Sequence, residues 1–200
     1  MDHVDVPLAK LPLMDQAMDG TAAGNRLERA REGDLAAFRE LLRSHQGRVF
    51  SMALRFTGRR ADAEELAQDV FLQLHGALAQ IHSEAHLKHW LLRTVSHRCI
   101  DRLRSERRRP QLVPIEALAD GAEGSTTQLQ PDPLAGARLR RLLLELAPDA
   151  RAVMLLRFQE DLDPADIAVV LGMSVNTVKS HLRRSLEWLR AQLAGDGDGS

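Results

Sequence analysis

The stretch DPADIAVVLGMSVNTVKSHLRRSLEWLR, Asp163 to Arg190, decides the fold of this chain because it contains the signals for two short helices joined by a tight turn. Asp163 is a helix-capping residue, and Pro164 takes the first helical position, where its missing N–H costs nothing. Gly172 ends the first helix, since glycine accepts the left-handed backbone that a sharp reversal needs. Ser174 then caps a second helix. This pattern is typical of a helix-turn-helix, whose second helix can enter a DNA major groove.

The second helix of this stretch has two different faces. Apolar residues repeat at helical spacing on one face: Val175, Val178, Leu182, Leu186 and Leu189. The outward residues and the cap are hydrogen-bond donors and cations, which suit phosphates and base edges. We assign them to a candidate DNA-binding surface: Ser174, Asn176, Thr177, Lys179, Ser180, His181, Arg183 and Arg184. The same pattern also fits an ordinary helical hairpin with a solvated basic face.

Charge is distributed unevenly along the chain, although the net charge is only −1. The segment from Lys88 to Arg109 has eight cations and two acids, whereas Gln111 to Pro133 has four acids and no Lys or Arg. A basic stripe therefore adjoins an acidic segment, and the near-neutral total does not identify a partner. The 200 residues are 44% hydrophobic and 28% charged, which is an ordinary globular composition that allows one domain or two.

Cysteine content and hydropathy indicate the compartment. Cys99 is the only cysteine, so no internal disulfide can form, which fits a reducing environment. We interpret it as a buried small hydrophobe. No apolar run approaches membrane-spanning length, and the first residues are acidic where a signal peptide would be basic. We expect a cytoplasmic protein without membrane insertion.

Helical periodicity extends over most of the chain, and strand-like alternation is absent. We predict an all-α fold of two small helical domains, residues 26–109 and 134–194, joined by a flexible linker at 110–133 that is rich in Pro, Gly and small polar residues. Residues 1–25 are expected to be a mobile arm and 195–200 a disordered tail. We expect helices at residues 27–43 with a break and new cap at 33–34, and at 45–57, 61–80, 87–108, 134–147, 148–158, 164–171 and 175–190.

Two more segments indicate a family. DAEELAQDVFLQL (Asp62–Leu74) resembles the Ala-Glu-Asp-Leu-x-Gln-Asp/Glu-x-Phe segment of bacterial extracytoplasmic-function (ECF) sigma factors, in the sigma-70 superfamily. WLLRTVSHRCIDRLRSERRR (Trp90–Arg109) resembles the Trp-Leu…Asp-x-x-Arg helix of the same family. The region from Leu146 to Arg190 resembles the family's region-four domain, including the Thr-Val-Lys-Ser of its recognition helix. Together the resemblance covers most of residues 27–190.

The resemblance implies a transcription initiation factor that is not an enzyme and has no catalytic site, cofactor or small-molecule substrate. Such a factor binds core RNA polymerase, brings it to promoter DNA and melts the upstream edge of the bubble. Residues 26–109 would be sigma region 2, which binds core polymerase and the minus-ten element. Residues 134–194 would be sigma region 4, which reads the minus-thirty-five element with the candidate DNA-binding surface. An anti-sigma factor is a further expected partner.

The resemblance assigns polymerase binding to one flank of the Asp62–Leu74 helix. We name this set the polymerase flank: Glu65, Gln68, Asp69 and Leu72. Three of its members are three or four residues apart, so they share a side of the helix that differs from the apolar side. Without the neighbouring motifs, the same residues would be interpreted as a solvated acidic face.

The resemblance assigns minus-ten binding to the next helix and the preceding loop, residues 81–89. A melted promoter needs a pocket for a flipped base and cations for the freed strand. The candidate minus-ten residues are Lys88, Arg93, His97, Arg98, Arg102, Arg104 and Arg107. Helical spacing places Arg93, Arg104 and Arg107 on one flank, and Arg98 and Arg102 on another. Asp101 matches an acid of the family, and we expect it to tie one helix to another. His97 departs from the asparagine usual there, and His181 from a common arginine.

Two alternatives remain open. A stand-alone helix-turn-helix transcription regulator would explain Pro148–Arg190 and leave Asp62–Arg109 unexplained. A metal-binding or hydrolytic enzyme would use His82, His86 and His89, whose spacing would place three imidazoles on one helix face. The acid of the His-Glu-x-x-His zinc pattern is missing, so we predict no metal site.

Overall fold

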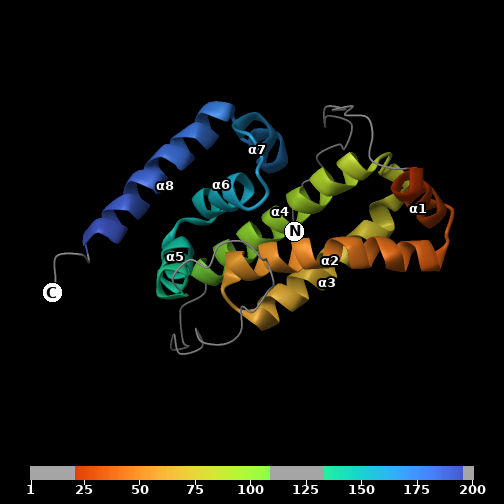
Figure 1. Cartoon of the computed structure of the whole chain (residues 1–200), viewed down its shortest axis with the longest axis horizontal. Helices are drawn as coiled ribbons and strands as arrows, with labels where there is room; N and C mark the ends of the chain where they lie inside the picture. Colours follow the sequence, from red (N-terminus) through yellow and green to blue (C-terminus); the bar gives the residue numbers. More distant parts are fainter. Residues whose placement is uncertain (1–20, 109–132, 196–200) are drawn as a thin grey trace.

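The computed structural model describes residues 21–108 and 133–195 of the chain. Within these ranges it contains eight α-helices, a single 3-10 turn and no strand, which confirms the all-α prediction. Most of the predicted arm, linker and tail lies outside the described residues. The elements are α1 (Thr21–Arg31), α2 (Leu35–Thr57), α3 (Arg60–Ala77), η2 (Leu78–Gln80), α4 (Glu84–Arg108), α5 (Pro133–Glu145), α6 (Pro148–Phe158), α7 (Pro164–Leu171) and α8 (Val175–Gly195) (Figure 1).

Short-range sequence signals set several helix ends as predicted. Asp163 caps α7, because its Oδ1 accepts hydrogen bonds from the backbone N of Ala165 at 2.7 Å and of Asp166 at 2.9 Å. Asp34 caps α2 in the same way. Gly172 ends α7 with φ +66°, a left-handed conformation that strains residues with a Cβ. The turn between α7 and α8 is therefore the tight reversal that the sequence indicates.

Three predicted boundaries are wrong. The predicted break between residues 43 and 45 does not occur, and α2 continues through Gly47, because its buried face (Leu41, Val49, Met52) packs over the full length and outweighs local propensity. The first helix begins at Thr21, before the expected position 27. The helix expected from residue 87 begins at Glu84, so much of the predicted 81–89 loop is helical. There the Ser83 hydroxyl accepts from the backbone N of His86 at 3.1 Å, a cap that we missed.

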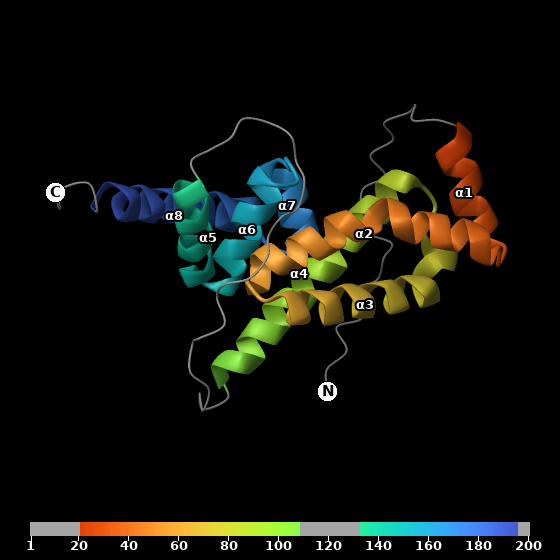
Figure 2. The same ribbon diagram turned by 60° about the horizontal axis from the view of Figure 1, so that its bottom comes forward.

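The four N-terminal helices pack around a core with fully buried side chains such as Leu41, Met52, Phe56 and Leu74. On its other side α4 packs against α6 and α7, so that it lies between the two halves of the chain (Figure 2). The core is continuous across this contact and includes Leu156 of α6. A smaller apolar cluster joins α5, α6 and α8. The two predicted domains are thus packed together in this structure.

Candidate polymerase and nucleic-acid interfaces

The candidate DNA-binding surface lies on α8 as predicted. The Ser174 hydroxyl accepts from the backbone N of Thr177 at 3.1 Å and so begins the helix. Val178 is fully buried and anchors the helix, which packs on α6 and α7. All members of the surface are exposed except His181, which is half-buried. Arg183 pairs with Glu187 one turn later, with Nη1 and Oε1 3.1 Å apart.

Val175, which we assigned to the apolar face of α8, does not belong to it. It is the first residue of the helix and its side chain is 38% exposed, beside the candidate DNA-binding surface. The period-3.6 pattern could not reveal this, because the apolar face begins one turn later, where α8 meets α7. A branched apolar side chain at this position is suited to contact with a thymine methyl group.

The polymerase flank on α3 is exposed over its whole length. Glu65, Gln68 and Asp69 face solvent, and Leu72 is 67% exposed. The neighbouring face of α3 is buried, with Leu66, Val70 and Leu74 in the core: this confirms that the two faces are distinct. A large apolar side chain among exposed polar groups is a feature of protein-binding surfaces.

A network of ion pairs joins α3 to the C-terminal half of α4. Arg102 is at its centre: its guanidinium lies 3.0 Å from Asp62, 3.2 Å from Glu65 and 3.1 Å from Glu106. These carboxylates, Glu65 first, raise the pKa of Arg102 above its usual range. Asp62, not Asp101, therefore ties the helices together, and Asp101 is exposed. The resemblance assigned Arg102 to the minus-ten element, but in this structure its guanidinium is engaged by the carboxylates of Asp62, Glu65 and Glu106.

A second set of candidate minus-ten residues faces region four. Arg93 donates through Nη1 to the Val169 carbonyl at 3.1 Å, and His97 Nε2 lies 3.3 Å from the Val170 carbonyl. Arg104 Nη2 donates to both carboxylate oxygens of Asp149, at 2.9 and 2.8 Å.

We call Arg93, His97 and Arg104 the minus-ten face of α4. They lie on a different side of the helix from Arg102, as their spacing predicts. Burial, and then the charge of Arg93, lower the pKa of His97.

Three minus-ten candidates remain, and they are spread along α4. Lys88 is half-buried, and Arg98 and Arg107 are exposed. The histidine rings at positions 82 and 86 lie near each other, with centroids 5.8 Å apart. Among the described residues, no group of three or more His, Cys, Asp or Glu side chains is placed to hold a metal ion.

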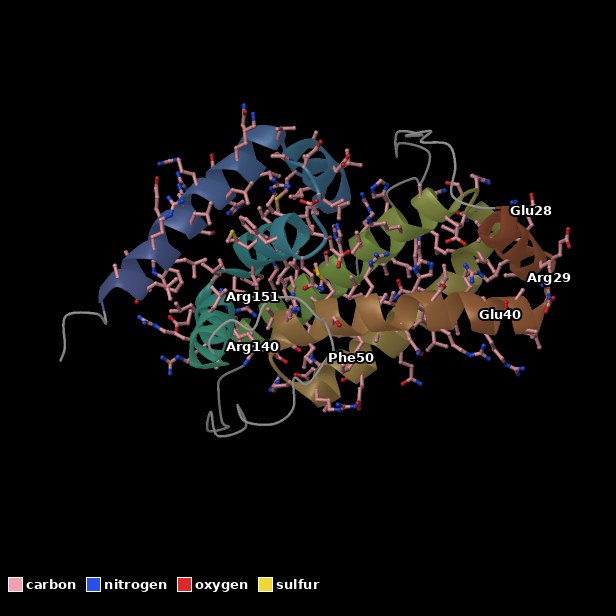
Figure 3. All side chains as sticks on the ribbon, viewed as in Figure 1. Glu28, Arg29, Glu40, Phe50, Arg140 and Arg151 are labelled. Atoms are coloured by element: carbon pink, nitrogen blue, oxygen red, sulfur yellow. The ribbon has the colours of Figure 1, made fainter. Side chains whose placement is uncertain are left out.

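Arg151 is a buried guanidinium at the junction of the two halves, and no motif in the sequence indicated a role for it (Figure 3). It donates to the carbonyl of Phe56 at the end of α2, and to those of Leu144 and Leu146 at the end of α5. Carbonyls at helix C-termini carry partial negative charge, so they serve as acceptors for Nη1 and Nη2 without a carboxylate, while the buried Nε has no hydrogen-bond partner among the described residues. Burial lowers the pKa of Arg151 to about 10.

The chain matches two family models of known transcription factors. Sigma-70 region 2 matches residues 41–109, and Sigma-70, region 4 matches residues 136–189. The ECF RNA polymerase sigma factor SigM of Mycobacterium tuberculosis is 32% identical over 163 residues, which are 81% of this chain and 78% of that protein. The chain belongs to the ECF sigma factors of the sigma-70 family.

Other relatives agree with this membership. The RNA polymerase sigma-E factor of Streptomyces avermitilis is 31% identical over 80% of this chain and 87% of that protein. The ECF sigma factor SigE of Mycolicibacterium smegmatis is 32% identical over 81% of this chain, which spans 65% of that relative's length. The protein is therefore a sigma factor that directs RNA polymerase to promoters. The stand-alone regulator is not favoured, because it leaves the region 2 match unexplained.

Two solved structures resemble the fold. CnrH, in complex with the cytosolic domain of CnrY, superposes with a TM-score of 0.63 at 23% identity and covers 88% of this chain and 99% of that one. The sigma factor RpoE of Bartonella quintana, in complex with the anti-sigma factor NepR, superposes with a TM-score of 0.61 at 18% identity. The match covers 78% of this chain and 96% of that one. At these identities the likeness concerns the helical architecture. None of the described helices is long and apolar enough to cross a membrane.

Proposed function

We propose that three separate surfaces divide the work of this sigma factor. The polymerase flank of α3 binds core polymerase, the cations of α4 bind the minus-ten strand, and the candidate DNA-binding surface of α8 reads the minus-thirty-five element. The observation that carries this proposal is the exposure of Leu72 among Glu65, Gln68 and Asp69 on α3. The other side of this helix is buried in the core. The factor acts by binding and positioning, without catalysis of its own.

The division has a physical reason. Each domain alone offers only a few phosphate contacts, and binding through a few phosphates is weak and salt-sensitive. Core polymerase holds both domains at once, so the first DNA contact raises the effective concentration of the second. Promoter selection therefore depends on the assembled holoenzyme, because neither domain suffices by itself.

We also propose that an anti-sigma factor binds this chain. RpoE was solved in complex with the anti-sigma factor NepR. The present chain shares that helical architecture and exposes apolar side chains on separate helices, including Leu72 on α3 and Phe158 at the end of α6. Exposed apolar groups of this size are the kind that a protein partner covers.

Reciprocal variants test the proposed division. Lys179, Arg183 and Arg184 replaced together by alanine should leave core affinity unchanged and lower the salt slope of holoenzyme binding to a promoter by about three, one for each lost phosphate contact. Gln68 and Asp69 replaced by alanine should weaken core binding instead. Run-off transcription with core polymerase over a genomic fragment library identifies the promoter, and fluorescence anisotropy measures both affinities.

The matched control removes three exposed arginines of α1 and α2 that belong to neither surface, Arg31, Arg39 and Arg43. It should leave both affinities unchanged. Loss of core binding in the α8 variant, or full core affinity in the α3 variant, would contradict the assignment.

A further inference from the structure

We propose that the surface of α3 that binds core polymerase extends beyond Leu72 to Gly76, where the polymerase packs directly on the backbone of the helix. The inference rests on the proposed role of the polymerase flank and deepens it. It adds a residue that acts through its missing side chain, and it specifies the chemistry of the polymerase surface that faces α3.

Gly76 continues the polymerase flank by one more turn of the helix. Glu65, Asp69, Leu72 and Gly76 are spaced by four, three and four residues, so they form a single line along α3. All four residues are exposed. The opposite side of α3 lies in the core, so a partner can cover this line without moving the helix.

The fold of the described residues does not require glycine at this position. Gly76 lies in the last turn of α3, which ends at Ala77, and its φ is outside the left-handed range that favours glycine. A Cβ at Gly76 would meet no described atom within 4 Å, apart from those of its own stretch of helix. Glycine in a helix is destabilising relative to alanine, because it loses more backbone freedom on folding. The chain thus has a destabilising residue where folding alone would accept alanine.

The bare backbone at Gly76 lies beside a projecting apolar side chain. Leu72 is 67% exposed and precedes Gly76 by one turn. An apolar side chain of a partner can therefore contact the side of Leu72 and the Cα of Gly76 together. Dispersion attraction needs close contact, since a gap of about 1 Å forfeits up to half of it. A Cβ at position 76 would open such a gap along the line.

Charge gives the line two different ends. The carboxylates of Glu65 and Asp69 lie in its N-terminal part, and Leu72 and Gly76 form its C-terminal part. Glu65 also lies 3.2 Å from the Arg102 guanidinium of α4, which fixes one edge of the surface. The complementary polymerase surface is therefore basic opposite the first turns of the line and apolar opposite Leu72 and Gly76.

Gly47 of α2 is a matched reference for Gly76. It is also an exposed glycine within a helix, its φ is outside the left-handed range, and a Cβ there would likewise meet open space among the described residues. The exposed side chains one and two turns before it, Arg43 and Glu40, are polar. Gly47 belongs to none of the proposed polymerase and DNA surfaces. Substitutions at Gly47 therefore report the effect of helix propensity without a partner contact.

Stability and binding, measured separately on the full chain, test the proposal. Gly76→Ala should leave the urea midpoint equal to or above that of the wild type, because alanine favours the helix. It should nevertheless weaken binding to core polymerase about tenfold, because an added methyl group in a packed contact forces the partner away. Gly76→Leu should weaken binding further. Gly47→Ala and Gly47→Leu should keep the wild-type affinity for core polymerase, measured by fluorescence anisotropy of the labelled chain.

Two results would overturn the extension of the surface to Gly76. The first is wild-type affinity for core polymerase in both Gly76 variants. The second is a Gly76→Ala urea midpoint below that of the wild type, because glycine would then serve the fold. The variant with Gln68 and Asp69 replaced by alanine distinguishes the two levels of the account. If that variant also keeps full core affinity, the proposed function fails; if it loses affinity while both Gly76 variants keep theirs, only the extension fails.

Discussion

At the scale of single residues, the helix-turn-helix depends on a few positions with defined backbone roles. Asp163 satisfies two backbone donors at the start of α7, and Gly172 supplies the left-handed residue that ends it. Asp163 thus sets where α7 begins, and Gly172 sets the reversal between α7 and α8. A substitution at either position should disturb the whole helix-turn-helix half of the chain, since Ile167 of α7 and Val178 of α8 are buried in the same core.

Asp163→Ala should destabilise the chain by about 1 kcal/mol, because two backbone N–H groups of α7 lose their acceptor. Urea unfolding followed by circular dichroism measures the change. Glu28→Ala, an exposed acid on α1, is the matched control and should leave the midpoint unaltered. An Asp163→Ala midpoint equal to that of the wild type would show that the cap adds nothing here.

A capping residue such as Asp163 could be predicted from sequence, because its backbone partners are two or three positions away. The exposure of the polymerase-flank residues on one side of α3 could also be predicted, since a single helix places every third or fourth residue on one side. Arg151 was not predictable. Its acceptor at Phe56 is 95 positions away, and nothing in the sequence around an arginine identifies a distant backbone carbonyl as its partner. The pairing of Asp149 with Arg104, 45 positions apart, could not be predicted for the same reason.

At the scale of elements, α4 is a helix with two different polar sides. Arg102 faces α3 and its carboxylates, whereas Arg93, His97 and Arg104 face α6 and α7. The family resemblance placed all of these residues in a single group that binds the minus-ten element. Spacing divided them correctly into flanks, but only the packing shows which neighbour each flank meets. The network around Arg102 also connects Glu65 of the polymerase flank directly to α4.

The pH dependence of stability should report on the contact between α4 and α7. Burial lowers the pKa of His97 in the folded chain, with Arg93 adding to it and Asp101 opposing. As the pH falls below about 6.5, the unfolded chain takes up this proton first, so stability falls with decreasing pH. His97→Gln should therefore lose less stability than the wild type between about pH 7 and about pH 5.5.

Urea midpoints at the two pH values measure this difference. His75→Gln, an exposed histidine on α3, serves as the control and should retain the wild-type pH dependence. Identical pH dependence in the His97 variant and the wild type would indicate that His97 titrates as freely in the folded chain as in the unfolded one.

At the scale of the whole molecule, the chain is two family modules packed on a common helix. The sequence predicts both modules, because each has its own periodic apolar faces and its own motifs. It predicts them as separate units, whereas the structure gives them a continuous core across α4, α6 and α7. The apolar residues that join the halves are indistinguishable, in a helical pattern, from residues that fill a single domain. Simultaneous binding of both promoter elements on core polymerase, which the proposed function requires, is expected to separate the halves that are packed together here.

Energy transfer between two dyes tests this requirement most directly. Gln46→Cys on α2 and Ala165→Cys on α7 are exposed positions on opposite sides of the contact, and the buried Cys99 stays unlabelled. Transfer should be high in the free chain and should fall when core polymerase and a promoter are added. Unchanged transfer in complexes that go on to transcribe would contradict the expected separation of the two halves.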